Sequence, residues 1–226
     1  ERGIDVELAE MRPHVTTPAH NTEGFAELVC SNSLRSNSLE NASGLLKEEM
    51  RRADSLIINC ADESRVPAGI ALAVDRDVFS KKVTERIQNH PKITIRREEV
   101  SSLDDSQTTI IASGPLTSPA LSADIARLTQ GKYLYFYDAI SPILNADSID
   151  MSTAFLASRY DKGVEEGGQG DYINLGLSEE QYTEFHTDLL EGEKIPLRDF
   201  EKAIFFEGCL PLEEMASRGK ETLAFG

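Results

Sequence analysis

A helix pattern followed directly by strand patterns constrains the fold of this chain more than any other feature of its sequence. Phe79, Val83 and Ile87 are spaced four residues apart, which places them on one face of a helix. Asp77 can cap this helix and Pro91 ends it. Helices that alternate with strands form α/β layers, so we predict an α/β fold.

Strand patterns lie on both sides of this helix. Apolar and polar residues alternate in 4–8, and again from Ile93 towards Val100. A short apolar run, 108–112, then leads into the turn 113–115, whose sequence is Ser-Gly-Pro. The succession predicts a sheet with at least some parallel pairing.

A third pattern predicts one long helix over 43–63. Its apolar stripe is spaced by four, three, four and three residues and consists of Leu46, Met50, Ala53, Ile57 and Cys60. Cys60 is expected to be a small buried hydrophobic residue, because that is how a free cysteine on such a stripe usually behaves.

Two capping signals mark helices further along. Ser118 precedes Pro119 at the start of one helix, and Ser178 with Gln181 forms a capping box. The inward face of the second helix is expected to consist of Tyr182, Phe185 and Leu189.

Beyond Gly131 the sequence pattern favours strands more than helices. Alternating aromatic residues in 133–137 and an extended segment, 155–160, indicate more strand beyond Gly131. We therefore predict a domain boundary near residue 118, between a domain of residues 1–118 and a mixed α+β domain of residues 119–226.

Charge and hydropathy exclude several classes of protein. The 226 residues include 23 Lys and Arg against 39 Asp and Glu, a formal net charge of -16. No apolar run reaches the roughly 20 residues that a membrane span needs. The acidic average argues against a generic basic nucleic-acid binder and leaves room only for a local basic patch.

The three cysteines and four histidines are too few and too scattered for a disulfide framework or a zinc site. A reducing cytoplasm is the simplest location for such a chain, and no metal is expected. Because the chain starts without Met and both ends look cut, we expect it to be a piece of a longer protein.

Glu10 directly follows the first strand pattern. An acidic residue at the end of a second Rossmann strand binds the ribose of a dinucleotide, but an exposed strand-end carboxylate is an equal alternative. The glycine-rich fingerprint would lie about 20 residues earlier, before the first residue of this chain.

Two cysteines lie at chemically suggestive places. Cys30 leads into a segment, 31–43, in which eight of thirteen residues are Ser or Asn. That segment is by default a solvated loop, although its donors could also line a site for a polar planar ligand. Cys209 precedes a helix predicted to start at Pro211, where the helix dipole favours a thiolate, while three nearby glutamates oppose it.

Several blocks of sequence together resemble one family, the folate- and FAD-dependent tRNA uracil-5-methyltransferases (TrmFO). These blocks follow the family's order over nearly the whole chain: Glu10–Pro13, Phe25–Arg35, Gly44–Met50, Arg65–Gly69, Ala71–Arg76, Gly114–Leu121, Ser158–Gly163 and Phe206–Cys209. The resemblance implies a Rossmann-like FAD-binding domain, here without its glycine fingerprint, with an inserted domain.

The resemblance also implies an activity. Members of the family methylate C5 of the T-loop uridine of tRNA, with methylenetetrahydrofolate as carbon donor and FAD and NAD(P)H as reductants. Neither the choice between NADH and NADPH nor the oligomeric state follows from the sequence.

The resemblance assigns roles to individual residues. Cys209 would be the nucleophile that adds to uracil C6 and Cys30 an assisting base or thiol, or the two roles are exchanged. Glu10 and Arg12 would bind the cofactor, with Glu10 at the adenosine ribose. The remaining cofactor-binding residues would be Ser31, Asn32, Ser33, Leu34 and Arg35 along the flavin, Val100 at the adenine, and Ser113 and Gly114 in a turn beside the cofactor.

Departures from the family pattern touch no proposed catalytic group: Ile70 replaces a glycine, Ser113 replaces a threonine, and 164–171 is longer. Two alternatives stay open. One is the related glucose-inhibited-division type of flavoprotein, which modifies the tRNA wobble uridine. The other is a non-catalytic flavoprotein remnant that binds RNA or folate.

Overall fold

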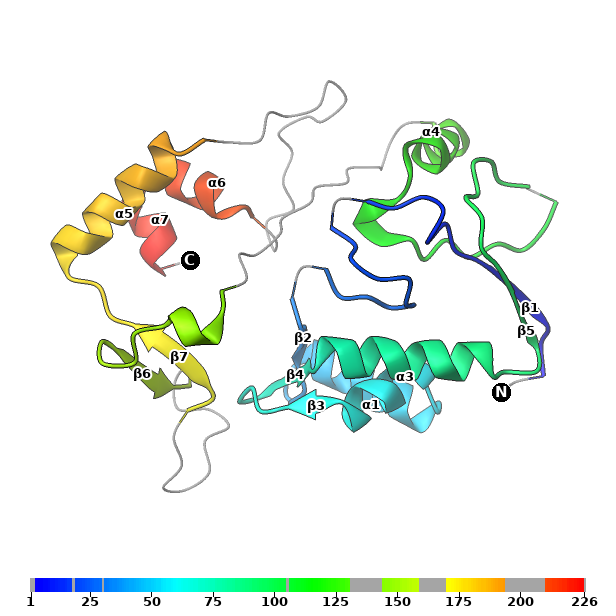
Figure 1. Ribbon diagram of the computed structural model, residues 1–226, viewed down its shortest axis with the longest axis horizontal. Coiled ribbons are helices and arrows are strands. Elements are labelled where there is room, and N and C mark those ends of the chain that lie inside the picture. The colour runs from blue at the N-terminus through cyan, green and yellow to red at the C-terminus, as the bar shows by residue number, and fades with distance from the viewer. Residues whose placement is uncertain are drawn as a thin grey trace. The chain divides into compact units, whose positions relative to one another are not determined.

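The computed structural model describes residues 3–17, 19–29, 31–104, 106–130, 144–158, 170–193 and 210–225 (Figure 1). The chain divides into two compact units, one of residues 1–100 and 140–174 and the other of residues 101–139 and 175–226. The predicted domain boundary near residue 118 stays a prediction.

A parallel pair of strands confirms the predicted parallel pairing. β1 (Val6–Ala9) pairs with β5 (Ile93–Arg96), with Val6 opposite Ile93 and Ala9 opposite Arg96. The fold is therefore mixed α/β, as predicted. β5 ends four residues before Val100, which lies in the irregular segment that follows.

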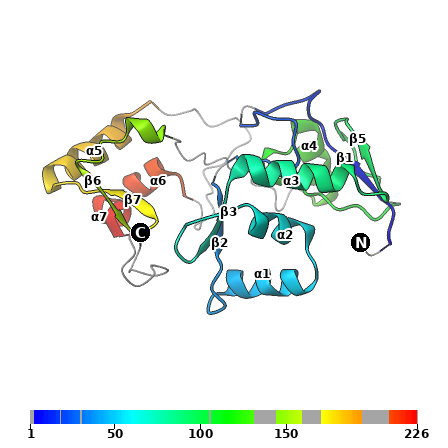
Figure 2. The same cartoon turned by 60° about the horizontal axis from the view of Figure 1, so that its bottom comes forward.

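A three-stranded antiparallel sheet lies between the two parallel strands in the sequence. Its order is β2-β4-β3, formed by β2 (Ser33–Ser36), β4 (Ala71–Val74) and β3 (Arg65–Val66). Part of the segment expected as a solvated loop is thus a strand. Three helices accompany the sheet, and α2 lies between α1 and α3 (Figure 2). They are α1 (Ala42–Arg52), α2 (Leu56–Glu63) and α3 (Arg76–Gln88).

The core of the first unit joins this sheet to α2 and α3. Its buried members are Phe25, Cys60, Ala61, Leu72, Val74, Phe79 and Val83. Cys60 has no exposed surface, which confirms its prediction as a core residue. Phe79 and Val83 are buried on one face of α3, again as predicted.

The single helix predicted over 43–63 is wrong, because the structure has two helices there. Asp54 adopts a left-handed backbone with φ of 57° and ends α1, and the Ser55 side chain then caps α2. The predicted apolar stripe is therefore not one buried face: on α1, Leu46 is exposed and Lys47 is buried. A stripe read across two helices is not one face.

The N-cap of α3 lies two residues before the predicted one. The Asp75 carboxylate, not that of Asp77, accepts hydrogen bonds from the amides of Asp77 and Val78, at 3.1 and 3.0 Å. Asp77 itself lies in the first turn, where its negative charge interacts favourably with the positive end of the helix dipole.

The buried strand predicted over 108–112 is wrong as well. The segment has no regular structure, and the Ile110 side chain is 87% exposed. An apolar run forms a strand only where neighbouring strands supply hydrogen bonds, and among the described residues β1 and β5 form a sheet of two strands only.

A two-stranded sheet, β6 (Ala154–Ala157) with β7 (Tyr172–Leu175), follows the short η2 helix (Ala146–Ser148). The end of β6 needs Gly170 nearby, because a Cβ there would lie 2.0 Å from the carbonyl carbon of Ala157. The other strand predicted in this part, 133–137, lies outside the described residues.

The second unit contains four helices among its described residues, with the short η1 helix (Gly114–Leu116) ahead of the first. They are α4 (Pro119–Leu128), α5 (Glu179–Glu191), α6 (Leu212–Ser217) and α7 (Lys220–Phe225). The caps predicted at Ser118 and at Ser178 with Gln181 are confirmed. Phe185 is wrongly predicted as inward, since its side chain is 41% exposed.

Candidate functional site

Glu10 directly follows β1, at the carboxyl end of that strand. Its amide donates a hydrogen bond of 2.9 Å to the carbonyl oxygen of Arg96, which continues the parallel ladder beyond β1. Ligands of open α/β sheets bind outside the carboxyl ends of the strands. Glu10 is therefore at a place where a ligand can be bound.

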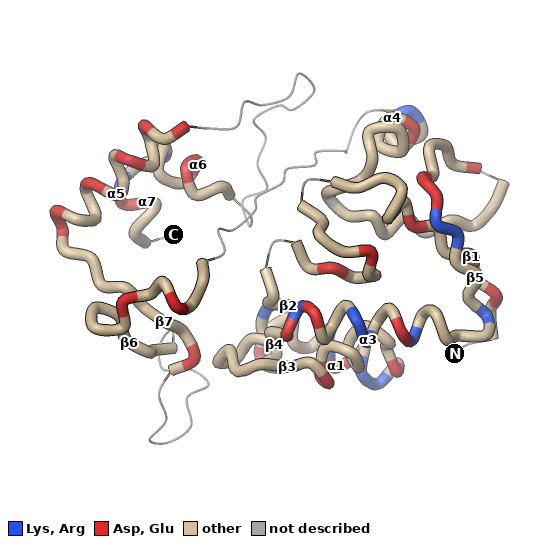
Figure 3. Tube along the Cα trace, viewed as in Figure 1, with Lys and Arg blue, Asp and Glu red and all other residues tan. Residues whose placement is uncertain are grey.

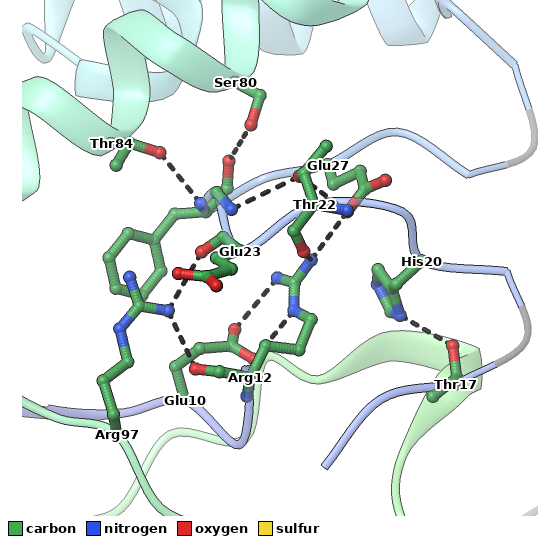
Figure 4. Close-up of polar contacts among 12 residues, drawn as sticks. Glu10, Arg12, Thr17, His20, Thr22, Glu23, Glu27, Ser80, Thr84 and Arg97 are labelled. Carbon is green, nitrogen blue, oxygen red and sulfur yellow. Dashed lines mark hydrogen bonds and ion pairs between the residues drawn. The ribbon is translucent and has the colours of Figure 1, made fainter. Parts of the chain in front are cut away.

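Arg12 holds both oxygens of the Glu10 carboxylate (Figure 4). Oε1 accepts from the Arg12 amide at 3.0 Å and from Nε at 2.9 Å, and Oε2 accepts from Nη2 at 3.1 Å. A carboxylate offers about four acceptor positions. Within the described residues one position on Oε2 is left for a further donor.

The same guanidinium binds a second carboxylate. Arg12 Nη1 donates to Glu27 Oε2 at 2.8 Å and to the carbonyl oxygen of Thr22 at 3.3 Å. The Arg12 side chain is only 5% exposed. We call the cluster of Glu10, Arg12, Thr22 and Glu27 the arginine hub.

Electrostatics keep the hub charged. Burial on its own would raise the pKa of the Glu10 carboxyl, but hydrogen bonds and charge from Arg12 outweigh it and hold the pKa below its ordinary value. Burial likewise opposes ionisation of Glu27, and hydrogen bonds from Asn21 and Thr22 lower its pKa overall. The bond to Glu10 raises the pKa of Arg12 further.

Arg97 fastens the hub to the core. Its Nη1 donates to the carbonyl oxygens of Arg12 and Glu23, at 3.1 and 3.0 Å, and its guanidinium lies 4.4 Å from the centre of the Phe25 ring. Phe25 in turn accepts at its carbonyl from Ser80 and donates its amide to Thr84, both on α3. The segment that carries Glu27 is thus fixed from both sides.

Sequence reasoning missed Glu27, Thr22 and Arg97 as members of this site. The only available signal was that Glu27 lies in the same block, 25–35, that carries the family resemblance. Arg96, the neighbour of Arg97, instead pairs with Glu7 at 2.8 Å and with Glu98.

The segment predicted to line the flavin alternates in and out along β2. Asn32 and Leu34 point inward: the Asn32 side-chain amide donates to the carbonyl oxygen of Val74 at 3.1 Å, and Leu34 packs against the core. Ser31, Ser33 and Arg35 are exposed. Arg35 has a left-handed backbone with φ of 67°, which is unusual for a residue with a side chain.

Ser113 and Gly114 form a tight turn in the second unit. The Ser113 and Thr117 hydroxyls are 2.7 Å apart, and Gly114 has φ of 66° with open space around a Cβ position. Val100 belongs to the first unit and is half-buried.

Cys30 and Cys209 lie outside the described residues, and their roles stay predictions. The described cysteine is Cys60, where burial raises the pKa of the thiol. This core thiol is therefore a poor nucleophile. Pro211 caps α6 rather than starting it.

A groove of about 600 Å³ lies beside the hub, between the segment 19–29 and α3. Its lining includes Thr22, Glu27, Leu28, Val29, Arg76 and Thr84. Pockets of this size accommodate cofactors and similar ligands.

Among the described residues, no helix has the length and apolar character that a membrane span requires. The same residues contain no group of three or more His, Cys, Asp or Glu side chains that could hold a metal ion.

The fold and the hub define a mixed α/β protein with an ionised carboxylate where such sheets bind ligands. The profile of the glucose inhibited division protein A family matches residues 1–225, and the chain belongs to this family. It is 55% identical over all 226 residues to a protein of Bacillus cytotoxicus, 58% to one of Bacillus pumilus and 55% to one of Natranaerobius thermophilus.

Each of these relatives is named methylenetetrahydrofolate–tRNA-(uracil-5-)-methyltransferase TrmFO. The chain covers 51% of each of them, so it spans about half the length of the curated relatives that it matches.

Proposed function

We propose that this chain is part of a TrmFO-type enzyme that methylates C5 of the T-loop uridine in tRNA. The observation that carries the proposal is the identity of 55–58% over all 226 residues to proteins named methylenetetrahydrofolate–tRNA-(uracil-5-)-methyltransferase. The T-loop position is taken from the family resemblance. Methylenetetrahydrofolate donates the carbon, and NAD(P)H is the proposed source of electrons.

FAD is the proposed cofactor, and the arginine hub fits it. Glu10 is ionised, lies at the carboxyl end of β1 and retains an acceptor position on Oε2, which suits a ribose hydroxyl donor. When bound, the flavin supplies the redox chemistry that a methylene group needs to become a methyl group. Arg12 orients Glu10, and the exposed side chains of Ser31, Ser33 and Arg35 are proposed to face the cofactor.

The remaining cofactor contacts are proposed on resemblance. Val100 would meet the adenine through its backbone, and Ser113 and Gly114 would form the turn beside the cofactor. The region 119–226 would be the inserted domain.

The two cysteines supply the proposed covalent chemistry. Uracil C5 is a weak nucleophile until a thiolate adds to C6, which gives C5 the electron density to attack an electrophilic carbon. We propose Cys209 as this thiolate and Cys30 as an assisting base or thiol. Once C5 carries the new carbon, loss of the C5 proton to a base restores the C5–C6 double bond and expels the Cys209 thiolate.

RNA contact must be local in so acidic a chain. Acidic positions recur along α5, whereas the first unit holds 16 of the 23 Lys and Arg residues, together with 23 of the 39 Asp and Glu residues (Figure 3). We therefore propose that RNA approaches the first unit, with binding that weakens as salt increases.

The test uses the flavin-loaded protein, T-loop RNA, methylenetetrahydrofolate and NADH or NADPH. Methyl incorporation at uracil C5 is expected, and methyl transfer from S-adenosylmethionine instead would reject the proposal. Cys209→Ala should abolish covalent trapping of RNA that contains 5-fluorouracil. Cys60→Ala is the matched control and should trap normally; loss of trapping with Cys30→Ala alone would reverse the two roles.

The matching family is described as glucose inhibited division protein A. The second candidate is therefore wobble-uridine modification, the activity that the resemblance implies for flavoproteins of this type. An anticodon stem-loop RNA distinguishes the two, because only this second activity would modify it. A protein that binds flavin and modifies neither RNA would be a non-catalytic remnant.

A further inference from the structure

The Arg12 guanidinium is bonded on two sides. Nε and Nη2 face Glu10, whereas Nη1 faces Glu27 and the carbonyl oxygen of Thr22. A planar group held on both edges cannot turn without breaking bonds on one of them. The orientation of the Arg12 edge that bonds Glu10 is therefore fixed by Glu27 and the Thr22 carbonyl on the opposite edge.

Glu27 is itself held without help from Arg12. Its Oε1 accepts from the Asn21 amide at 2.8 Å, and its Oε2 accepts from the amide and hydroxyl of Thr22, at 3.2 and 2.9 Å. The Glu27 side chain is 13% exposed. The Glu27 carboxylate is thus held in place by Asn21 and Thr22, and through its bond to Arg12 it orients the guanidinium that bonds Glu10.

We propose that Glu27 is a positioning residue that orients the Glu10 carboxylate, through Arg12, for the hydroxyl groups of a ribose. The inference rests on the proposed function, because it takes the adenosine ribose of FAD as the ligand of Glu10. In this arrangement Glu27 does not contact the ribose itself. Its effect is to keep the remaining acceptor position of Glu10 Oε2 pointing in one direction.

A purely structural role for Glu27 makes a different prediction. If Glu27 only held the segment 21–27 in place, its loss would weaken every ligand of the site to the same degree. If it orients Glu10, its loss removes specifically the recognition of ribose hydroxyls. The preference of the protein for FAD over an analogue that lacks the 2′-hydroxyl of the adenosine ribose separates the two roles.

Because the chain spans about half the length of its relatives, the experiment uses the flavin-free full-length protein and measures binding of FAD and of this deoxy analogue by quenching of flavin fluorescence. The unmodified protein should prefer FAD about tenfold, as expected for one hydrogen bond to a charged group. Glu27→Gln should reduce the preference to below about threefold. Glu23→Gln removes the same charge from an exposed neighbouring side chain and should keep the tenfold preference.

Equal weakening of both ligands by Glu27→Gln, with the preference intact, would overturn the inference. If Glu27→Gln does not fold, Thr22→Val tests the same point, because it removes one donor to Glu27 and leaves the charges in place. A reduced preference supports the inference and an unchanged one rejects it. An unmodified protein that binds neither ligand would instead reject the proposed cofactor.

Discussion

The hydroxyl of Tyr172 donates a hydrogen bond of 2.9 Å to the carbonyl oxygen of Ala68, which lies 104 residues earlier in the chain. The carboxylate of the preceding residue, Asp171, accepts from the Gly69 amide. Together these bonds fasten the start of β7 to the turn that joins β3 and β4. Because β4 is the central strand of its sheet, the contact supports the strand pair that presents Ser33 and Arg35.

Tyr172→Phe should therefore loosen the turn without unfolding the protein. The Ala68 carbonyl also accepts from the Ala71 amide, so no acceptor is left without a donor and the loss should be about 1 kcal/mol of unfolding free energy. Amide hydrogen exchange at Gly69 should become faster. Tyr182→Phe is the matched control, since that hydroxyl bonds the Lys220 carbonyl in the other unit; faster exchange at Gly69 in this variant would contradict the assignment.

Periodicity predicted the elements whose side chains follow one face for several turns. Phe79 and Val83 on α3 were found in this way, and the capping box of Ser178 with Gln181 was found from a local sequence signature. In each case the deciding contacts are local, so the sequence pattern carries them.

The arginine hub was not predictable by the same means. Arg12 and Glu27 are fifteen residues apart, with no repeat that joins them, and they meet because the chain folds back onto β1. The break between α1 and α2 depends on one left-handed residue, Asp54, which periodicity does not register. Contacts that form where the chain folds back on itself cannot be predicted from local sequence patterns alone.

An experiment on the N-cap of α3 can distinguish the cap that the structure shows, Asp75, from the cap predicted from the sequence, Asp77. Asp75→Ala should lower the unfolding free energy by about 1 kcal/mol, because two amides lose their acceptor. Asp77→Ala should lose only about 0.3–1 kcal/mol, from a weaker interaction with the helix dipole. Urea unfolding of both variants measures the difference, and a larger loss for Asp77→Ala would restore the cap inferred from the sequence.

Gly44 allows close approach of α1 to the segment after β2. A Cβ at this position would lie 1.9 Å from the Ser38 carbonyl oxygen, so Gly44→Ala must displace backbone and should cost about 1–3 kcal/mol. Gly176→Ala is the control, because nothing lies within 4 Å of a Cβ there and its φ is not in the left-handed region. Thermal unfolding compares them; equal melting temperatures would show that α1 does not pack this closely on Ser38.

Acid should weaken the arginine hub in a defined direction. Although burial opposes it, Glu10 and Glu27 have folded-state pKa values below the ordinary glutamate value, owing to Arg12 and to the amides around Glu27. Such groups stabilise the fold fully above their unfolded pKa, about 4.3, and lose this contribution as the pH falls through the lower folded pKa.

Urea unfolding between pH 7 and pH 3 measures this loss. The unfolding free energy of the unmodified protein should decrease below about pH 4.3, and Glu27→Gln should make the decrease shallower because one proton-binding site of the unfolded state is gone. Glu23→Gln removes the same charge from an exposed side chain of the same segment and is the variant for comparison. Since only a group that binds protons differently in the two states contributes to the slope, an acid slope unchanged by Glu27→Gln would mean that the Glu27 carboxylate gains nothing from the hub.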